Sequence, residues 1–136
     1  MSGMPIFDIA GSALAAQSVR LNAVASNLAN ADDVSGDPAT VYRPREAVFS
    51  AMSVDPANPS LAGVRTSGVM ESQAPPIKRY EPGNPLADGT GYVYAPDIDP
   101  VAQMVNMISS SRAYQADVEV VNTAKELAMS TLSMGH

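Results

Sequence analysis

The chain has 136 residues, a formal net charge of −6 and 46% apolar residues, but only 5% of its residues are aromatic. This acidity excludes nucleic acid as a partner, because phosphate binding needs a basic stripe and the Lys and Arg residues here are scattered. The chain has no cysteine, which excludes disulfides, thiolate nucleophiles and cysteine-ligated metals, and no apolar run is long enough to insert into a membrane.

The first predicted element is a long helix from Pro5 to about Asn30. Proline suits the first turn of a helix, and the polar segment that begins at Asp32 ends it. One side of this helix carries residues at the alternating three- and four-residue spacing of a helix seam: Phe7, Ala10, Leu14, Gln17, Leu21, Val24, Leu28 and Ala31. Because a single apolar stripe cannot leave water alone, the seam predicts a partner helix.

The opposite side of the same helix is polar but almost uncharged. Its only charges are Asp8 and Arg20, and its other polar residues are Ser12, Ser18, Asn22, Ser26, Asn27 and Asn30. Small hydroxyl and amide side chains allow another backbone to approach closely and to form hydrogen bonds. Two interpretations remain open for this segment alone: a helix enclosed on most sides by protein, or an ordinary amphipathic helix in a small globular core.

Between Asp32 and Pro100 the chain is rich in proline, with ten of its eleven proline residues. Helices of any length are therefore excluded there. Strand-like runs are predicted at residues 41–42, 46–51, 64–70, 77–80 and 90–94, with turns at residues 55–59, 81–85 and 88–89. We expect a small, irregular β region with extended loops.

The last predicted element is a helix of about 34 residues, about 50 Å long, that begins at Pro100. Asp99 is well placed as its N-cap, with proline at the first helical position. The three/four spacing again predicts a seam, which consists of Met104, Met107, Ser111, Tyr114, Val118, Val121, Lys125, Ala128 and Leu132.

The predicted fold is mainly α with a small irregular β insert. Residues 1–31 form an N-terminal helix, residues 32–99 a proline-rich β/loop insert and residues 100–136 a C-terminal helix, all in one structural unit. The two long helices are expected to pair as a coiled coil. Because isolated helices of this kind are marginal in water, the ends of the free monomer are predicted to be poorly ordered and to fold on assembly.

No residue pattern indicates catalysis, a metal or a cofactor. The single histidine is His136, the last residue, where an imidazole is poorly placed for a charge relay or a metal site. Asp97 and Asp99 suit helix capping better than acid–base chemistry. Lys125 is interpreted as a snorkelling side chain at a helix contact rather than an amine nucleophile. The sequence therefore predicts a protein that is not an enzyme.

Three blocks of the sequence carry a family resemblance. They consist of residues 6–14 with Gln17, residues 20–22 and residues 25–31; residues 80–88 with residues 91–93; and residues 104–108 with residues 111–116 and Lys125. Together they resemble the flagellar rod and hook axial protein family. The middle block and the short chain length are similar to the proximal rod members rather than to the longer distal rod and hook members.

The resemblance implies a structural subunit of the basal-body rod, the helical drive shaft that transmits motor torque to the hook. It implies export through the flagellar type III apparatus without a cleaved signal peptide, and a position in the part of the flagellum that spans the periplasm. The implied partners are other rod proteins of the FlgB, FlgF and FlgG type, the hook–basal body adaptor FliE, and copies of the same chain.

The predicted assembly interface uses both helices. It consists of Phe7, Leu14, Gln17, Leu21, Asn22, Val24, Asn27, Leu28, Asn30, Met104, Met107, Ile108, Arg112, Tyr114, Val118, Val121 and Leu132. Two alternatives remain beside the proximal rod: another member of the rod family, or a secreted or cytosolic helical-hairpin module that captures one partner. The binding module predicts a folded monomer and a one-to-one complex, whereas the rod subunit predicts polymeric partners.

Overall fold

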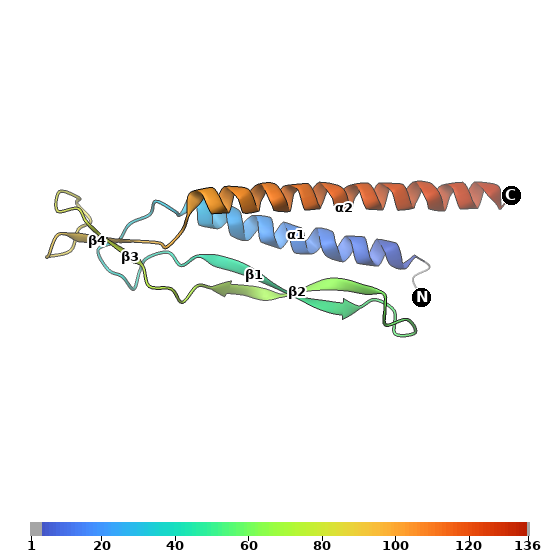
Figure 1. The fold of residues 1–136 in the computed structure, drawn as a ribbon, viewed down its shortest axis with the longest axis horizontal. Helices are drawn as coiled ribbons and strands as arrows, with labels where there is room; N and C mark the ends of the chain where they lie inside the picture. Colours follow the sequence, from blue (N-terminus) through green and yellow to red (C-terminus); the bar gives the residue numbers. More distant parts are fainter. Residues whose placement is uncertain (1–3, 136) are drawn as a thin grey trace.

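The computed structural model describes residues 4–135, so His136 lies outside the described residues. Two long helices flank four strands in the order α1 (Pro5–Ala29), β1 (Arg45–Ser53), β2 (Ala62–Glu71), β3 (Ile77–Tyr80), β4 (Tyr92–Ala95) and α2 (Pro100–Met134). The predicted fold class, mainly helical with a small β insert, is confirmed. The helices run antiparallel, and α2 continues past the N-terminal end of α1 (Figure 1).

The molecule is elongated and has three layers over most of its length. The hairpin of β1 and β2 contacts α1, and α1 contacts α2 on its other side (Figure 1). The small β3–β4 hairpin lies apart, at the end where α2 begins (Figure 1). Consequently α1 is the central layer, and it holds the hairpin and α2 together.

The helix ends form where the sequence predicts them. Pro5 and Pro100 occupy first-turn positions, and the Asp99 carboxylate accepts a hydrogen bond from the Val101 N–H at 3.0 Å, which is the predicted N-cap. At the end of α1 the Ser26 carbonyl accepts two hydrogen bonds from Asn30, one from its side-chain amide at 2.8 Å and one from its backbone N–H at 3.1 Å.

The strands form two separate antiparallel pairs. β1 pairs with β2 with a register shift between Val48 and Phe49, opposite Gly68, which has a φ of 153°. The shift is a β-bulge, and glycine is favoured there because it adopts a positive φ without strain. β3 pairs with β4, and Tyr94 of β4 also exchanges backbone hydrogen bonds with Ser35.

Two strand predictions in the insert are wrong. Residues 41–42 form no strand, because Pro44 follows closely and the Tyr42 side chain, not its backbone, makes the contact with α1. Thr90 lies in a turn rather than in β4, and the Gly91 N–H donates to the Asp88 carbonyl at 3.0 Å across that turn. The prediction of a tight turn at residues 88–89 is confirmed.

The Asp88 carboxylate organises the loop before β4. Its Oδ1 accepts from the backbone N–H groups of Tyr92 at 3.0 Å and Thr90 at 2.9 Å, and from the Thr90 hydroxyl at 2.7 Å. These donors, the Tyr92 N–H first and the Thr90 hydroxyl next, hold the pKa of Asp88 below its usual value. The loop is therefore built around an ionised carboxylate.

The buried core is small and consists of small side chains. Among the described residues, six of the nine buried apolar residues are alanines and three are valines, and none is Leu, Ile, Phe or Met. A core of this composition lets helix backbones approach closely but buries little apolar area. The nine residues are Ala10, Ala16, Ala23, Val24, Ala31, Val41, Val93, Ala95 and Ala124.

The seam predicted for α2 is wrong. The face of α2 that packs on α1 lies about one residue earlier in the sequence than the predicted seam. Ser110 and Ala124 are the buried residues of α2, whereas the prediction placed Ser111 and Lys125 in the seam. The reason is size, because serine and alanine allow the two helices to approach closely and the larger apolar side chains do not. Most of the large apolar side chains of α2 are consequently exposed, and Met107 and Val121 are half-buried.

Candidate assembly site

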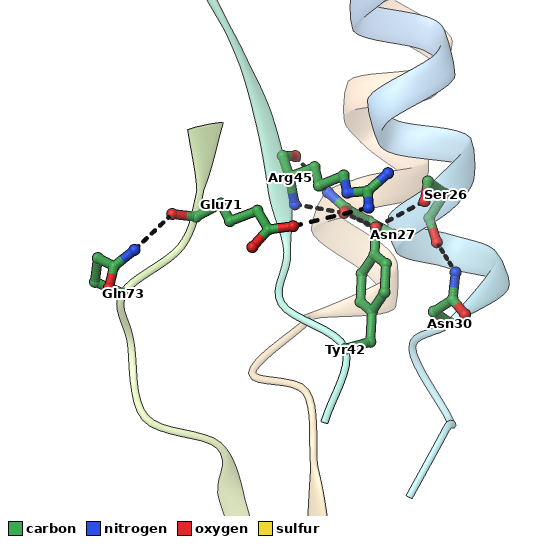
Figure 2. A network of polar contacts seen from close by, with 7 residues as sticks. All are labelled: Ser26, Asn27, Asn30, Tyr42, Arg45, Glu71 and Gln73. Carbon is green, nitrogen blue, oxygen red and sulfur yellow. Dashed lines mark hydrogen bonds and ion pairs between the residues drawn. The ribbon is translucent and has the colours of Figure 1, made fainter. Parts of the chain in front are cut away.

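The Asn27 side chain of α1 forms two hydrogen bonds with the backbone of β1, as a neighbouring strand would. Its Oδ1 accepts from the Arg45 N–H at 2.8 Å, and its Nδ2 donates to the Arg45 carbonyl at 2.9 Å (Figure 2). The side chain is 3% exposed, so these bonds are screened from water. One amide thereby satisfies both backbone groups at the start of β1.

The same amide bonds to two further groups, one of which also bonds to Ser26. The Tyr42 hydroxyl donates to Asn27 Oδ1 at 2.9 Å and shares a second hydrogen bond with the Ser26 hydroxyl at 2.8 Å (Figure 2). Asn27 Nδ2 also donates to Gln103 Oε1 of α2 at 3.3 Å. Asn27 therefore fixes the β1–β2 hairpin and α2 relative to α1 at a single point, which we call the Asn27 joint.

A second joint lies near the other end of the hairpin. The Ser12 hydroxyl accepts from the Val64 N–H at 3.0 Å and donates to the Ile9 carbonyl at 2.7 Å. Gly63 is buried beside it, and a Cβ at this position would lie 2.7 Å from Ser12 Oγ. The strand thus approaches the helix more closely than a side chain on residue 63 would allow. The two joints confirm that the small polar face of α1 bonds to another backbone.

Most of the exposed large apolar side chains of the described residues lie on α2. We call this group the α2 outer face, and it consists of Val101, Met104, Val105, Ile108, Tyr114, Val118, Val120, Leu127, Met129, Leu132 and Met134. Single exposed apolar residues are normal, but eleven on one helix mark an interaction surface. Seven of the eleven are Met, Ile, Leu or Tyr, which are residue types that the buried apolar core of the described residues lacks.

The solvent-accessible surface area of the chain is also larger than that of a compact monomer. The chain exposes 8779 Å², whereas a compact monomer of 14.1 kDa exposes about 6,700 Å². The excess of about 2,000 Å² corresponds to the surface that one subunit contributes to two or three standard interfaces of about 800 Å² per partner. The isolated chain therefore exposes more surface than a compact monomer of its mass, which leaves ample area for contacts with neighbours.

The assembly residues predicted on α1 lie at different depths. Val24 and Asn27 are buried, and Asn22 is exposed on the helix surface. Gln17 is half-buried, and among the described residues its Oε1 is the buried side-chain oxygen that has no hydrogen-bond partner. The remaining members are half-buried: Phe7, Leu14, Leu21, Leu28 and Asn30.

The assembly residues predicted on α2 lie mainly on its exposed side. Met107 and Val121 are half-buried, and the others are exposed: Met104, Ile108, Arg112, Tyr114, Val118 and Leu132. The structure therefore brings only Met107 and Val121 of this group toward α1 and leaves the other six exposed. It leaves them available to other molecules.

Sequence reasoning missed the residues that make the joints on the hairpin side. Tyr42, Arg45 and Gly63 gave no signal, because a backbone group that binds a side chain can belong to any residue. The residues of α2 that face α1, Ser110 and Ala124, could have been found by following small residues instead of large apolar ones. Neither described helix is long and apolar enough to cross a bilayer, and residues 4–135 contain no metal-binding group of His, Cys, Asp and Glu side chains.

The fold consists of two long helices and a proline-rich insert, and α2 has an uncovered apolar face. These features are typical of a structural subunit that packs against neighbouring molecules. Two family models match these helices: one for "Flagella basal body rod protein" at residues 7–36, and one for "Flagellar basal body rod FlgEFG protein C-terminal" at residues 90–134. The first covers most of α1, and the second covers β4 and α2.

Curated relatives match over 99% of this chain and 99% of their own length. They are the flagellar basal-body rod proteins FlgC of Salmonella typhimurium at 54% identity, of Escherichia coli O6:H1 at 53% and of Yersinia enterocolitica at 50%. The chain belongs to the family of flagellar basal-body rod proteins and is a structural subunit of the rod. Within that family its full-length relatives are the FlgC proteins.

Proposed function

We propose that this chain is a subunit of the proximal rod and transmits motor torque to the hook. The observation that carries the proposal is that the buried core and the α2 outer face contain side chains of different size. The buried core holds alanine and valine, and the α2 outer face holds eleven exposed large side chains. A drive shaft needs contacts that deform little, and close-packed apolar interfaces between many subunits have that property.

The same difference supports assembly into a filament. The assembly residues of both helices would be covered by rod neighbours of the FlgB, FlgF and FlgG type, by FliE and by other copies of this chain. Open association that does not close into a ring produces filaments. The absence of cysteine suits threading of an unfolded chain through the type III export channel into the periplasm, because no disulfide could block it. In this role the chain has no enzymatic activity.

The test is deletion of the coding sequence, followed by complementation and electron microscopy of basal bodies. Cells without the gene are expected not to swim and to lack rods, and the wild-type gene is expected to restore both. A variant with Leu127→Ser, Met129→Ser and Leu132→Ser is expected to be exported but not to restore rods, because these side chains are exposed in the subunit and buried only in the assembly.

The matched control replaces two exposed polar residues of the same helix segment, Ser130→Ala and Ser133→Ala, and is expected to restore swimming. Deleted cells that still build complete rods would contradict the proposed function. Wild-type swimming by the triple variant would show that the α2 outer face is not an assembly surface.

A further inference from the structure

The first turns of α2 carry a compact group of exposed apolar side chains. Val101, Met104, Val105 and Ile108 are between 54% and 68% exposed. Their positions follow the i, i+3, i+4, i+7 spacing with which an amphipathic helix binds a partner. Met104 and Ile108 each lie two residues from Asn106, which bonds to α1, and two residues turn a helix through about 200°. The group, which we call the α2 docking group, therefore faces away from α1.

The exposed side of α1 likewise lies opposite the side that packs on α2. Between Asp8 and Asn22 the exposed residues recur at alternating spacings of three and four: Asp8, Gly11, Ala15, Ser18 and Asn22. Ser18 lies two residues from Arg20, the residue that bonds to Asn106 of α2. We call these five residues the α1 outer face.

The α1 outer face is suited to contact with a second helix. Its side chains are small apart from Asn22 and Asp8, so another helix can approach closely at Gly11 and Ala15. The half-buried Leu14 precedes Ala15 and borders this face with apolar surface. A helix face that stays in water usually carries charges of both signs, whereas this face carries one carboxylate.

A pair of opposite charges selects the partner of the α2 docking group. Arg112 is exposed four residues after Ile108, on the same side of α2, and Asp8 is exposed on α1. Among the described residues neither forms an ion pair. Arg112 lies seven residues from Val105, and Asp8 lies seven residues from Ala15, about 10 Å along each helix. Pairing Arg112 with Asp8 between antiparallel helices therefore places Val105 against Ala15.

The acidic residues on either side of the α2 docking group are compatible with this register. Glu119 lies seven residues beyond Arg112, so it extends past the N-terminal end of the partner's α1, where the helix dipole favours an anion. Asp99 lies thirteen residues before Arg112 and comes level with the uncharged Asn22. Neither carboxylate is brought beside Asp8.

We propose that the α2 docking group packs on the α1 outer face of a second copy of this chain, with Arg112 paired to Asp8. This inference rests on the proposed function, because it assumes that copies lie side by side in the rod. The contacting helices are antiparallel, as α1 and α2 are within one chain, so the two copies point the same way (Figure 1).

The pair of Arg112 and Asp8 gives the offset between the two copies. Within one chain Arg20 bonds to Asn106, so Leu14 lies level with Arg112. In the proposed contact Asp8 of the second copy takes that level, and the second copy is therefore shifted by six residues, about 9 Å. Because the two surfaces differ, each α1 lies between two α2 helices, and the contact repeats from copy to copy instead of ending at a dimer.

Disulfide cross-linking tests the contact directly, since the chain has no cysteine of its own. Ala15→Cys with Val105→Cys is expressed in the deletion strain, and isolated basal bodies are oxidised. Covalent dimers, trimers and larger species are expected, because the two positions lie on opposite sides of one chain and meet only between copies. The control is Ala15→Cys with Ala116→Cys, which moves the second cysteine eleven residues, about 16 Å, along the same side of α2. It is expected to give no cross-link.

A charge exchange decides the matter if the cysteine variants do not assemble. Asp8→Arg and Arg112→Asp are each expected to reduce the number of rods per cell at least tenfold, because each brings like charges together. The two changes combined are expected to restore at least half of the rods. Arg112→Asp with Glu119→Arg keeps the net charge of the chain but not the pair, and it is expected to restore none.

Four results would overturn the inference: cross-links that stop at dimers, no cross-links in swimming cells, equal cross-linking by the control, or a failure of the exchange to restore rods. If Asp8→Arg cells swim normally while deleted cells have no rods, the inference fails and the proposed function stands.

Discussion

Replacing Asn27 with alanine is expected to lower the free energy of unfolding by about 3 kcal/mol and to release the β1–β2 hairpin from α1. The side chain is buried, and its removal leaves the Arg45 N–H and carbonyl and Gln103 Oε1 without their partner, while the Tyr42 hydroxyl keeps only its bond to Ser26. Each buried polar group left unpaired costs about 1–3 kcal/mol. Some of these groups can reach water, so the sum stays well below the additive maximum.

Urea denaturation measures the loss of stability, and amide hydrogen exchange in β1 shows whether the hairpin is released. The control is Asn22→Ala, on the same helix, because Asn22 is exposed and makes no side-chain hydrogen bond within the described residues. It is expected to change stability by less than about 0.5 kcal/mol. Equal effects of the two substitutions would mean that the Asn27 joint does not hold the hairpin.

Replacing Gly63 with alanine is expected to cost about 2 kcal/mol, although it adds only one methyl group. The new Cβ would lie 2.7 Å from Ser12 Oγ and 3.1 Å from Val54 Cγ1, so helix and strand must separate. Overpacking of this kind costs about 1–3 kcal/mol. Thermal or urea unfolding of the purified chain measures the change.

The control for this prediction is Gly11→Ala, since a Cβ there meets nothing within 4 Å and alanine favours a helix. That substitution is expected to stabilise the chain by about 0.5–1 kcal/mol. In a Ser12→Ala background the cost of Gly63→Ala is expected to fall below about 1 kcal/mol, because the clashing oxygen is gone. A cost that does not depend on Ser12 would show that the close approach of strand and helix is not the cause.

Much of the fold could be predicted from the sequence because its signals are local. Pro5 and the Asp99–Pro100 pair mark helix starts by fixed backbone geometry, and the prolines of the insert exclude helices without reference to the rest of the chain. The small polar face of α1 predicted backbone contacts, which Ser12 and Asn27 make. The partners of those contacts depend on the register of the strands, and a bulge at Gly68 shifts this register. The sequence does not show that shift.

The face of α2 was predicted wrongly for a reason that matters for function. Periodicity finds the most apolar stripe of a helix and assumes that this stripe is buried in the chain's own core. In this chain the close contact between α1 and α2 uses Ser110 and Ala124, and the apolar stripe remains outside. Sequence periodicity therefore identified a surface that the isolated chain does not bury.

The central claim is that the α2 outer face is covered only by other subunits, and amide hydrogen exchange of α2 tests it most directly. Residues 125–134, which follow the last buried residue of α2, are to be compared between dilute monomer and purified basal bodies. The account predicts rapid exchange in the monomer, where α2 extends past α1 and lacks a second partner, and protection at least a hundredfold stronger in the rod (Figure 1). Equal and strong protection in both states would contradict it.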